Sequence, residues 1–368
     1  MTARNHSLDH IKAIACLTIV LHHLVFYSPM ADVVRPAVPA LVDALRDQGR
    51  MAVQVFLVLG GYLAASALAP QGLAKHSAFW QPLGQRFVRL SVPYSAALVV
   101  ALVVNETVRG LGFDHPSVSE TPTWDGVLAH LLLLHSVGDW ESISAGVWYV
   151  AIDFQLYALC LLWWWLCRQQ TAWSGLGQAG MVVGTGASLW LWNLDSSLDV
   201  WALYFFGAYG LGMMAWWATH AQHGYQRGLW MVLITLLGGI ALGMEWRERI
   251  ALALVTAGVL AIGGNLRWPP ALRDGQCGPL VWMGQRSYSI FLIHFPMGLL
   301  VSAEVQASHP HSMLANALGM LLAVALSIAT GAVLYEWTER PKATWQRLRR
   351  WQLGAMSTGL IATLLQIF

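Results

Sequence analysis

The sequence has few charged residues. Asp, Glu, Lys and Arg make up 11% of its 368 residues, whereas hydrophobic residues make up 57% and the mean hydropathy is +0.53. Soluble domains average about a quarter charged residues. This composition excludes an ordinary soluble domain and predicts a protein that crosses the membrane several times.

Cysteines and nucleotide-binding motifs are also scarce. The four cysteines show no metal-ligand spacing, and Cys16, Cys160 and Cys167 lie in apolar runs. We therefore expect Cys16, Cys160, Cys167 and Cys277 to be small apolar residues, and we expect no disulfide and no metal site. The chain contains no P-loop, so ATP is not implied. The formal net charge is only +2, and no basic tract suggests nucleic-acid binding.

Long apolar runs and tryptophans are abundant instead. The 20 tryptophans suit the belts that form where a protein meets the membrane interface. A membrane-spanning helix needs about 20 apolar residues. Ten runs approach this length: 8–28, 51–69, 88–105, 146–167, 179–194, 200–218, 228–244, 249–264, 280–302 and 313–335. We predict an all-α bundle of about ten transmembrane helices in a single domain, 1–368, and leave open whether 352–368 forms an eleventh.

Basic residues are unevenly distributed between the loops. With the N-terminus placed in the cytoplasm, fifteen of the 21 Lys and Arg residues fall in cytoplasmic segments, including Arg4, Arg267 and Arg273. Cytoplasmic loops carry an excess of Lys and Arg. The distribution predicts a cytoplasmic N-terminus. The second long outer loop, about 106–145, contains the amphipathic stretch WDGVLAHLLLLHS, which is suited to the membrane surface.

Ionisable side chains inside apolar runs are candidates for function. The first run, LDHIKAIACLTIVLHH, contains Lys12, His22 and His23. Lys12 and His23 are eleven residues apart, which places them on one helix face about 16 Å apart along the axis. A buried histidine can act as a general base or in a proton relay. A structural interpretation is equally open, with Lys12 reaching the interface and His23 hydrogen-bonded between helices.

Three further positions stand out. Arg86 and Arg89 in QRFVRLSVPY lie one turn apart at the cytoplasmic end of a span, and two guanidiniums match the phosphates of a nucleotide-bearing cofactor. Ordinary positive-inside topology explains the same pair. Asp153 in VWYVAIDFQLYAL needs a partner, for which Arg86, Arg89 or a histidine is suitable. His294 in GQRSYSIFLIHFP is either structural or catalytic, and Pro296 frees a carbonyl that can line a cavity.

Six stretches occur in the order found in the membrane proteins of acyltransferase family 3: LDHIKAIACLTIVLHH, AVQVFLVLGGYLAAS, QRFVRLSVPY, VWYVAIDFQLYAL, SYSIFLIHFP and YEWTERP. The chain resembles this family over about residues 8–345. The resemblance implies a bacterial inner-membrane enzyme that moves an acyl group, most often acetyl, from cytosolic acyl-CoA to a hydroxyl of a surface or exported glycan or a lipid-linked saccharide. Lys12, His23, Arg86, Arg89, Asp153, Tyr157 and His294 fall on the positions of the family's motifs.

The chain departs from the family pattern at four positions. Gly60 replaces a serine, and Asp153 replaces a longer glutamate. Ala151 and Phe154 replace a serine and a second acid. These differences leave the positions of Lys12, His23 and the two arginines unchanged.

Together with this resemblance, the residues lead us to expect an acyltransferase that uses no metal. Its phosphate-bearing donor, acyl-CoA, is bound by Arg86, Arg89 and Lys12, with His23 as general base or acyl carrier and Asp153 or His294 orienting it. Two alternatives remain: a proton-coupled transporter of a polyol or saccharide, and a non-catalytic subunit of a polysaccharide export machine. The acceptor, the acyl group and the oligomeric state cannot be read from the sequence.

Overall fold

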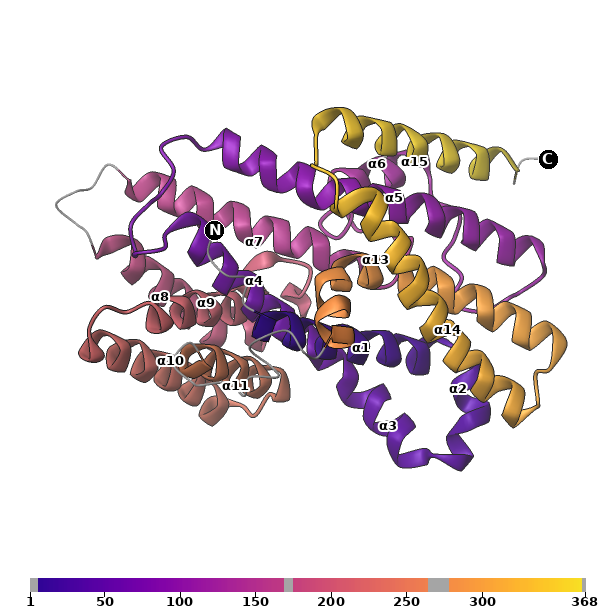
Figure 1. Cartoon of the computed structure of the whole chain (residues 1–368), viewed down its shortest axis with the longest axis horizontal. Coiled ribbons are helices and arrows are strands. Elements are labelled where there is room, and N and C mark those ends of the chain that lie inside the picture. Colours follow the sequence, from indigo (N-terminus) through magenta and orange to yellow (C-terminus); the bar gives the residue numbers. More distant parts are fainter. Residues whose placement is uncertain (1–5, 169–174, 264–277, 366–368) are drawn as a thin grey trace. The chain divides into compact units, whose positions relative to one another are not determined.

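The structure is a computed structural model that describes residues 6–168, 175–263 and 278–365 (Figure 1). The described residues form helices joined by turns and loops, without a β-strand. The predicted all-α architecture is therefore confirmed. Arg4, Arg267, Arg273 and Cys277, which entered the sequence predictions, lie outside the described residues.

Each of the ten predicted apolar runs falls on a helix. Seven helical segments in the described part of the chain are long and apolar enough to cross a membrane: Ser7–Tyr27, Pro39–Leu68, Trp80–Gly110, Val147–Cys167, Gly224–Met244, Gly278–Ser308 and Met313–Glu339. The helices α8 (Leu176–Trp190) and α11 (Glu248–Gly263) have only 15 and 16 residues. A multi-pass membrane protein follows from these segments, while the number of ten or eleven spans stays a prediction.

The chain divides into two compact units. Unit 1 comprises Met1–Arg50, Phe87–Ala151 and Asp274–Phe368, and unit 2 comprises Met51–Arg86 and Ile152–Arg273. The long helices α5 (Trp80–Gly110) and α7 (Val147–Cys167) contribute residues to both units.

Unit 1 is built around α13, which packs against α1 and α14. Its helices, besides parts of α5 and α7, are α1 (His6–Tyr27), α2 (Pro29–Val34), η1 (Arg35–Ala37), α3 (Pro39–Gln48), α6 (Trp124–Leu131), α13 (Gly278–Ser308), α14 (Met313–Leu334), the π-helical turn η6 (Tyr335–Glu339) and α15 (Trp345–Leu365), with η2 (Gly49–Ala52) leading out of it.

Glycines allow the helices of unit 1 to approach closely. A Cβ atom on Gly284 of α13 would lie 1.8 Å from the Asp9 carbonyl oxygen of α1. A Cβ atom on Gly331 of α14 would lie 2.7 Å from the Cα atom of Ile290 on α13. Membrane helices associate through such small residues because lipid provides no hydrophobic driving force between them. The backbone contacts hold α1, α13 and α14 together and fix the position of residues on α1 and α13.

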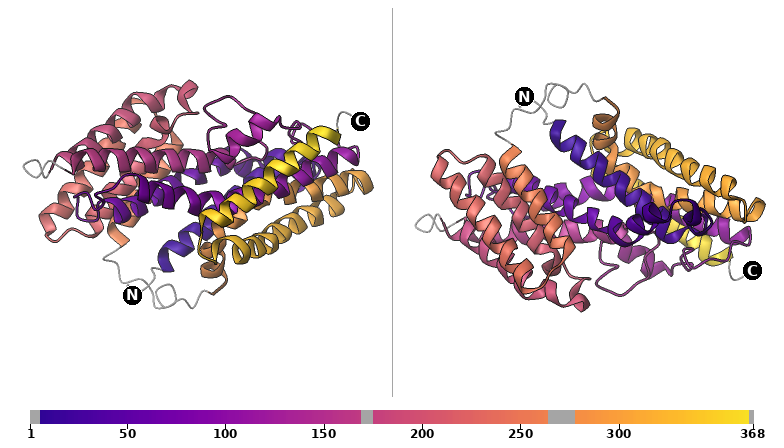
Figure 2. Two further views of the ribbon diagram at one scale, coloured as in Figure 1. Left: turned by 90° about the horizontal axis from the view of Figure 1, so that it is seen from above. Right: turned by 90° about the horizontal axis from the view of Figure 1, so that it is seen from below.

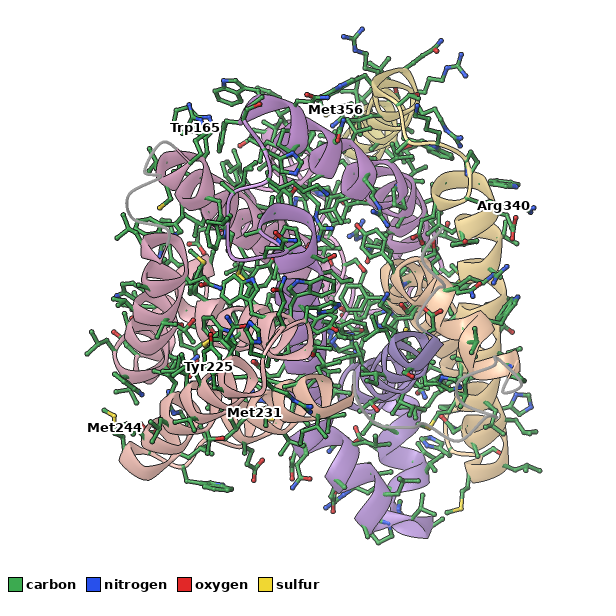
Figure 3. The ribbon with its side chains drawn as sticks, turned by 60° about the vertical axis from the view of Figure 1, so that its left-hand side comes forward. Trp165, Tyr225, Met231, Met244, Arg340 and Met356 are labelled. Atoms are coloured by element: carbon green, nitrogen blue, oxygen red, sulfur yellow. The ribbon has the colours of Figure 1, made fainter. Side chains whose placement is uncertain are left out.

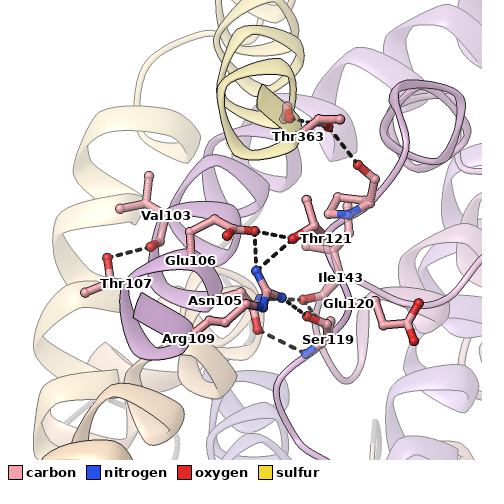
Figure 4. A network of polar contacts seen from close by, with 12 residues as sticks. Val103, Asn105, Glu106, Thr107, Arg109, Ser119, Glu120, Thr121, Ile143 and Thr363 are labelled. Carbon is pink, nitrogen blue, oxygen red and sulfur yellow. Dashed lines mark hydrogen bonds and ion pairs between the residues drawn. The ribbon is translucent and has the colours of Figure 1, made fainter. Parts of the chain in front are cut away.

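The loop after α5 is held by a polar network (Figure 4). Arg109 pairs with Glu106 at 2.5 Å and donates to the Thr121 hydroxyl at 2.7 Å. Asn105 donates to the Ile143 carbonyl at 3.1 Å. The first eight residues of the predicted amphipathic stretch, 124–131, form α6, which packs against α15. Its position at a membrane surface stays a prediction.

Helix α15 lies beside α5 in unit 1 (Figure 2). Leu348 near its start packs against Val88 and Val92 of α5. Near its end, the Thr363 hydroxyl donates to the Pro122 carbonyl at 3.4 Å, beyond the last turn of α5. A helix of 21 residues is about 31 Å long. Residues 352–365 therefore belong to a helix that follows the length of α5.

Unit 2 is built around α9 (Ala202–Thr219), whose residues are almost all buried. It packs against α4 (Val53–Leu68), α8, α10 (Gly224–Met244) and α11. The short turns η4 (Trp192–Leu194) and η5 (Ser196–Leu198) join α8 to α9. Cβ atoms on Gly61 and Gly212 would lie 1.8 and 1.9 Å from carbonyl oxygens of the facing helix, so α4 and α9 touch along their backbones.

The exposed side chains of α10 in unit 2 are mostly apolar, as is expected of a lipid-facing helix. On α10, Tyr225 and Met244 are 73% and 55% exposed, and Met244 lies at the left-hand edge of the view in Figure 3. Of the three cysteines in the described residues, Cys16 and Cys160 are buried, as expected of small apolar side chains, and Cys167 is half-buried.

Candidate active site

Two histidines of unit 1 meet between α1 and α13. The Nδ1 atom of His23 lies 2.7 Å from the Nε2 atom of His294, and the two rings are stacked with their centroids 5.0 Å apart. The His294 side chain is buried, and His23 is half-buried. The two rings meet because α1 is held against α13 at two other places. Gly284 lies against the Asp9 carbonyl, and the Cys16 thiol donates to the Ser287 carbonyl.

The hydrogen bonds around this pair assign the position of each proton. The Nδ1 atom of His294 lies 2.6 Å from the Phe291 carbonyl oxygen, which can only accept. In a neutral ring, His294 therefore carries its proton on Nδ1 and presents Nε2 as an acceptor. His23 must then donate from Nδ1, and its Nε2 atom keeps a free lone pair. We assign these tautomers from the hydrogen-bond network.

A small cavity of about 20 Å³ adjoins the histidine pair. This is room for about one water molecule. Its wall is mostly apolar, with Leu24, Phe295 and Leu299, but the hydroxyls of Ser28 and Ser302 also line it, 2.8 Å apart. The Ser302 hydroxyl donates to the Gly298 carbonyl, so Ser28 donates to Ser302. An imidazole lone pair beside an almost dry cavity is suited to proton transfer or to nucleophilic attack.

A second polar cluster of unit 1 surrounds Glu339, at the end of the π-helical turn η6. The charges of Arg89 and Lys12 both act on its carboxylate. The Ser289 hydroxyl donates to Glu339 Oε1 at 2.5 Å. Arg89 is exposed, and its guanidinium makes no hydrogen bond and no ion pair with the residues that the structure describes. The Arg89 guanidinium is therefore available to an anionic ligand.

Arg86 belongs to a different cluster, in unit 2. Its Nη2 atom lies 2.5 Å from Asp153 Oδ2, and the side chains are 24% and 7% exposed. The guanidinium also lies over the Tyr157 ring, 5.2 Å from its centroid. This is one of the pairings that the sequence suggested for Asp153. Gly60 leaves room for the Asp153 side chain, because a Cβ atom at this position would lie only 3.0 Å from Asp153 Oδ1.

The six residues singled out from the sequence thus form three sets. The structure joins His23 with His294, Arg86 with Asp153, and Lys12 with Arg89 through Glu339. Of the two residues expected to orient His23, His294 makes the contact. Asp153 instead makes its ion pair with Arg86.

Three contributors were missed from the sequence: Glu339, Ser289 and the Phe291 carbonyl. Glu339 lies in the YEWTERP stretch and Ser289 in SYSIFLIHFP, so both were within motifs already singled out. A backbone carbonyl has no sequence signal. No group of three or more His, Cys, Asp or Glu side chains within 6–168, 175–263 and 278–365 could hold a metal ion.

Comparison with known proteins gives one match. The sequence model of the acyltransferase domain of acyltransferase family 3 matches residues 5–336, nearly the whole chain. Comparisons with curated proteins and with solved structures give no match. The chain therefore belongs to acyltransferase family 3 and is a multi-pass membrane acyltransferase.

Proposed function

We propose that this protein transfers an acetyl group from cytosolic acetyl-CoA to a hydroxyl of a surface or exported glycan, or of a lipid-linked saccharide. We place it in the bacterial inner membrane with its N-terminus in the cytoplasm. The family supports acyl transfer in a membrane, and the uneven distribution of Lys and Arg supports the orientation.

The observation that carries the proposal is the free lone pair on His23 Nε2. In the transfer, the acceptor hydroxyl attacks the thioester carbonyl while His23 Nε2 takes the hydroxyl proton. The C–S bond breaks, and the CoA thiolate receives that proton as it leaves, so the products are an ester and free CoA. His294 keeps the His23 proton on Nδ1 and thereby keeps Nε2 available.

A covalent route uses the same atom. His23 Nε2 attacks the thioester first, the C–S bond breaks, and CoA leaves as the thiolate. The acceptor hydroxyl then takes the acyl group as the bond to Nε2 breaks, and its proton passes through His23 and solvent to the CoA thiolate, so the products are again an ester and free CoA. Both routes require the tautomer that the Phe291 carbonyl imposes through His294. They differ in one observable, since only the covalent route releases CoA before the acceptor is added.

The donor's phosphates need cations, and Arg89 and Lys12 are our first candidates. Arg89 has an exposed guanidinium, and Lys12 lies in the same polar cluster. A guanidinium binds phosphate through two parallel hydrogen bonds. Arg86 forms its ion pair with Asp153 within unit 2, so its expected contribution to donor binding stays a prediction.

Kinetics with labelled acetyl-CoA test the donor assignment. In membranes that contain the protein, Arg89→Gln should raise KM for acetyl-CoA about tenfold or more and change kcat little, because a charge-assisted hydrogen bond is lost. Arg349→Gln, which replaces an exposed arginine of the same unit, is the matched control and should leave KM unchanged. If label never leaves acetyl-CoA in the wild-type membranes, the donor proposal is wrong.

The acceptor is open to a direct measurement. Mass spectrometry of surface glycans from cells with and without the gene should show a loss of acetyl groups when the protein is absent. A transporter would instead change the amount of a glycan and leave its acetylation unchanged.

A further inference from the structure

A groove lies between α5 and α15 in unit 1, apart from the histidine pair and the Glu339 cluster. It has a volume of about 560 Å³ and is lined by Arg347, Arg350, Trp351 and Gly354 of α15 and by Val99 of α5. This size falls within the range of ligand pockets, about 300–1,000 Å³. Its lining combines two guanidiniums at one end with apolar surface at the other.

The groove lies where the side chains along α15 change from basic to mainly apolar. Between residues 340 and 350 the chain carries Arg340, Lys342, Arg347, Arg349 and Arg350, and no acidic residue follows Glu339. From residue 351 to 365 the exposed side chains are apolar apart from Ser357, and they include Leu353, Leu360 and Ile361. Such a boundary is expected where a helix passes from headgroups into hydrocarbon.

Exposed tryptophans lie near the same boundary between basic and apolar residues. Trp337 and Trp345 are 64% and 54% exposed, and both lie close in sequence to the start of α15. Tryptophan is enriched at the membrane–water interface. The guanidiniums of Arg347 and Arg350 are therefore expected at the height of lipid phosphates, with Val99 and Gly354 at the height of the first methylenes.

Arg350 is available for a ligand. It is exposed and makes no hydrogen bond or ion pair with any described residue. Arg347 donates one hydrogen bond to the Trp337 carbonyl and keeps its other nitrogens. In contrast, Arg340 is already paired with Glu336 at 2.5 Å (Arg340 is labelled in Figure 3). Basic pockets between helices on the cytoplasmic side suit anionic lipid headgroups.

We propose that this groove binds an anionic phospholipid. Arg347 and Arg350 hold the phosphate, and one acyl chain lies along Val99 and Gly354. Charge complementarity selects the headgroup, because the end of the groove carries two cations and no carboxylate among its lining residues. The site is independent of the acyl-transfer proposal.

Native mass spectrometry of the purified, delipidated protein tests the site with two probes. These are phosphatidylglycerol, which is anionic, and phosphatidylcholine with the same chains, which has no net charge. The wild type should retain phosphatidylglycerol in preference. Arg347→Gln/Arg350→Gln should weaken that binding about 30-fold, since each cation near a lipid surface contributes roughly fivefold. Arg350→Gln alone should weaken it about fivefold without affecting folding, because Arg350 has no partner within the described residues.

Two further variants separate the groove from diffuse surface charge. Arg349→Gln removes an exposed cation that does not line the groove and should leave binding within about twofold of the wild type. Gly354→Leu keeps every charge but fills the groove floor and should abolish the preference. Gly354→Ala should retain it, since a Cβ atom there meets Val99 at an ordinary 3.7 Å.

Several results would overturn the proposal. These are equal binding of the two lipids, an equal loss in Arg349→Gln and in Arg350→Gln, or unchanged binding in Gly354→Leu. Displacement of the bound lipid by free CoA would assign the arginines to the acyl donor instead.

Discussion

Breaking the ion pair between Arg86 and Asp153 should destabilise the protein more than it would at an exposed site. Asp153 is only 7% exposed, and Arg86 is 24% exposed. Arg86→Gln leaves a buried carboxylate without its ion-pair partner, and we expect a cost of about 3 kcal/mol in the free energy of unfolding. Asp153→Asn leaves the guanidinium over the Tyr157 ring with partial access to solvent, so we expect a smaller cost of about 2 kcal/mol.

A double-mutant cycle isolates the interaction itself. The double variant Arg86→Gln/Asp153→Asn leaves no unpaired charge, so we expect a total near 3 kcal/mol and a coupling energy of about 2 kcal/mol. Denaturant unfolding in detergent micelles measures all four proteins. Asp32→Asn provides the control, because it breaks the exposed Arg46–Asp32 pair and should cost below about 1 kcal/mol. Additive effects of the two single changes would show that the Arg86 and Asp153 side chains do not stabilise each other, and would refute this reasoning.

Three further predictions concern other parts of the fold. His294→Phe removes the acceptor for the His23 proton and should lower kcat for acetyl transfer about 10- to 100-fold with little change in KM, measured by steady-state kinetics. Burial lowers the pKa of His130 to about 4 and that of His135 to about 3, both below the ordinary value near 6.5. The unfolded state therefore binds more protons as pH falls from 7 to 5, and Tm should decrease, less so in His135→Phe. Gly61→Ala should lower Tm strongly, because its methyl group would clash with the facing carbonyl, whereas Gly243→Ala, with open space around it, should not.

The helices could be located from the sequence because an apolar run of membrane length almost always folds as a helix. Each of the ten predicted runs overlaps a helix, from 8–28 to 313–335. The division into two units could not be read from the sequence, because it depends on which helices pack together. Packing at Gly61, Gly212 and Gly284 depends on a partner backbone that no local pattern specifies.

Part of the candidate site could also be predicted from the sequence. His23 and His294 stood out because an ionisable side chain in an apolar run needs a partner. The helix geometry of α5 placed Arg86 and Arg89 together, but it could not show that Arg86 pairs with Asp153 while Arg89 stays exposed. That difference is set by α7, a helix distant in sequence. No role could be predicted for Glu339 from the sequence, because the end of η6 comes close to residues of α1 and α5 only in the folded protein.

The central claim is that His23 Nε2 performs the chemistry, and acetyl transfer by a matched pair of purified variants tests it most directly. His22→Ala removes the neighbouring histidine, whose Nδ1 atom hydrogen-bonds to the Leu45 carbonyl and which takes no part in the pair with His294. The account predicts that His23→Ala transfers acetyl at less than about 1% of the wild-type rate. His22→Ala should stay within about tenfold of the wild type. A folded His23→Ala protein that transfers acetyl from acetyl-CoA at the wild-type rate would contradict the account.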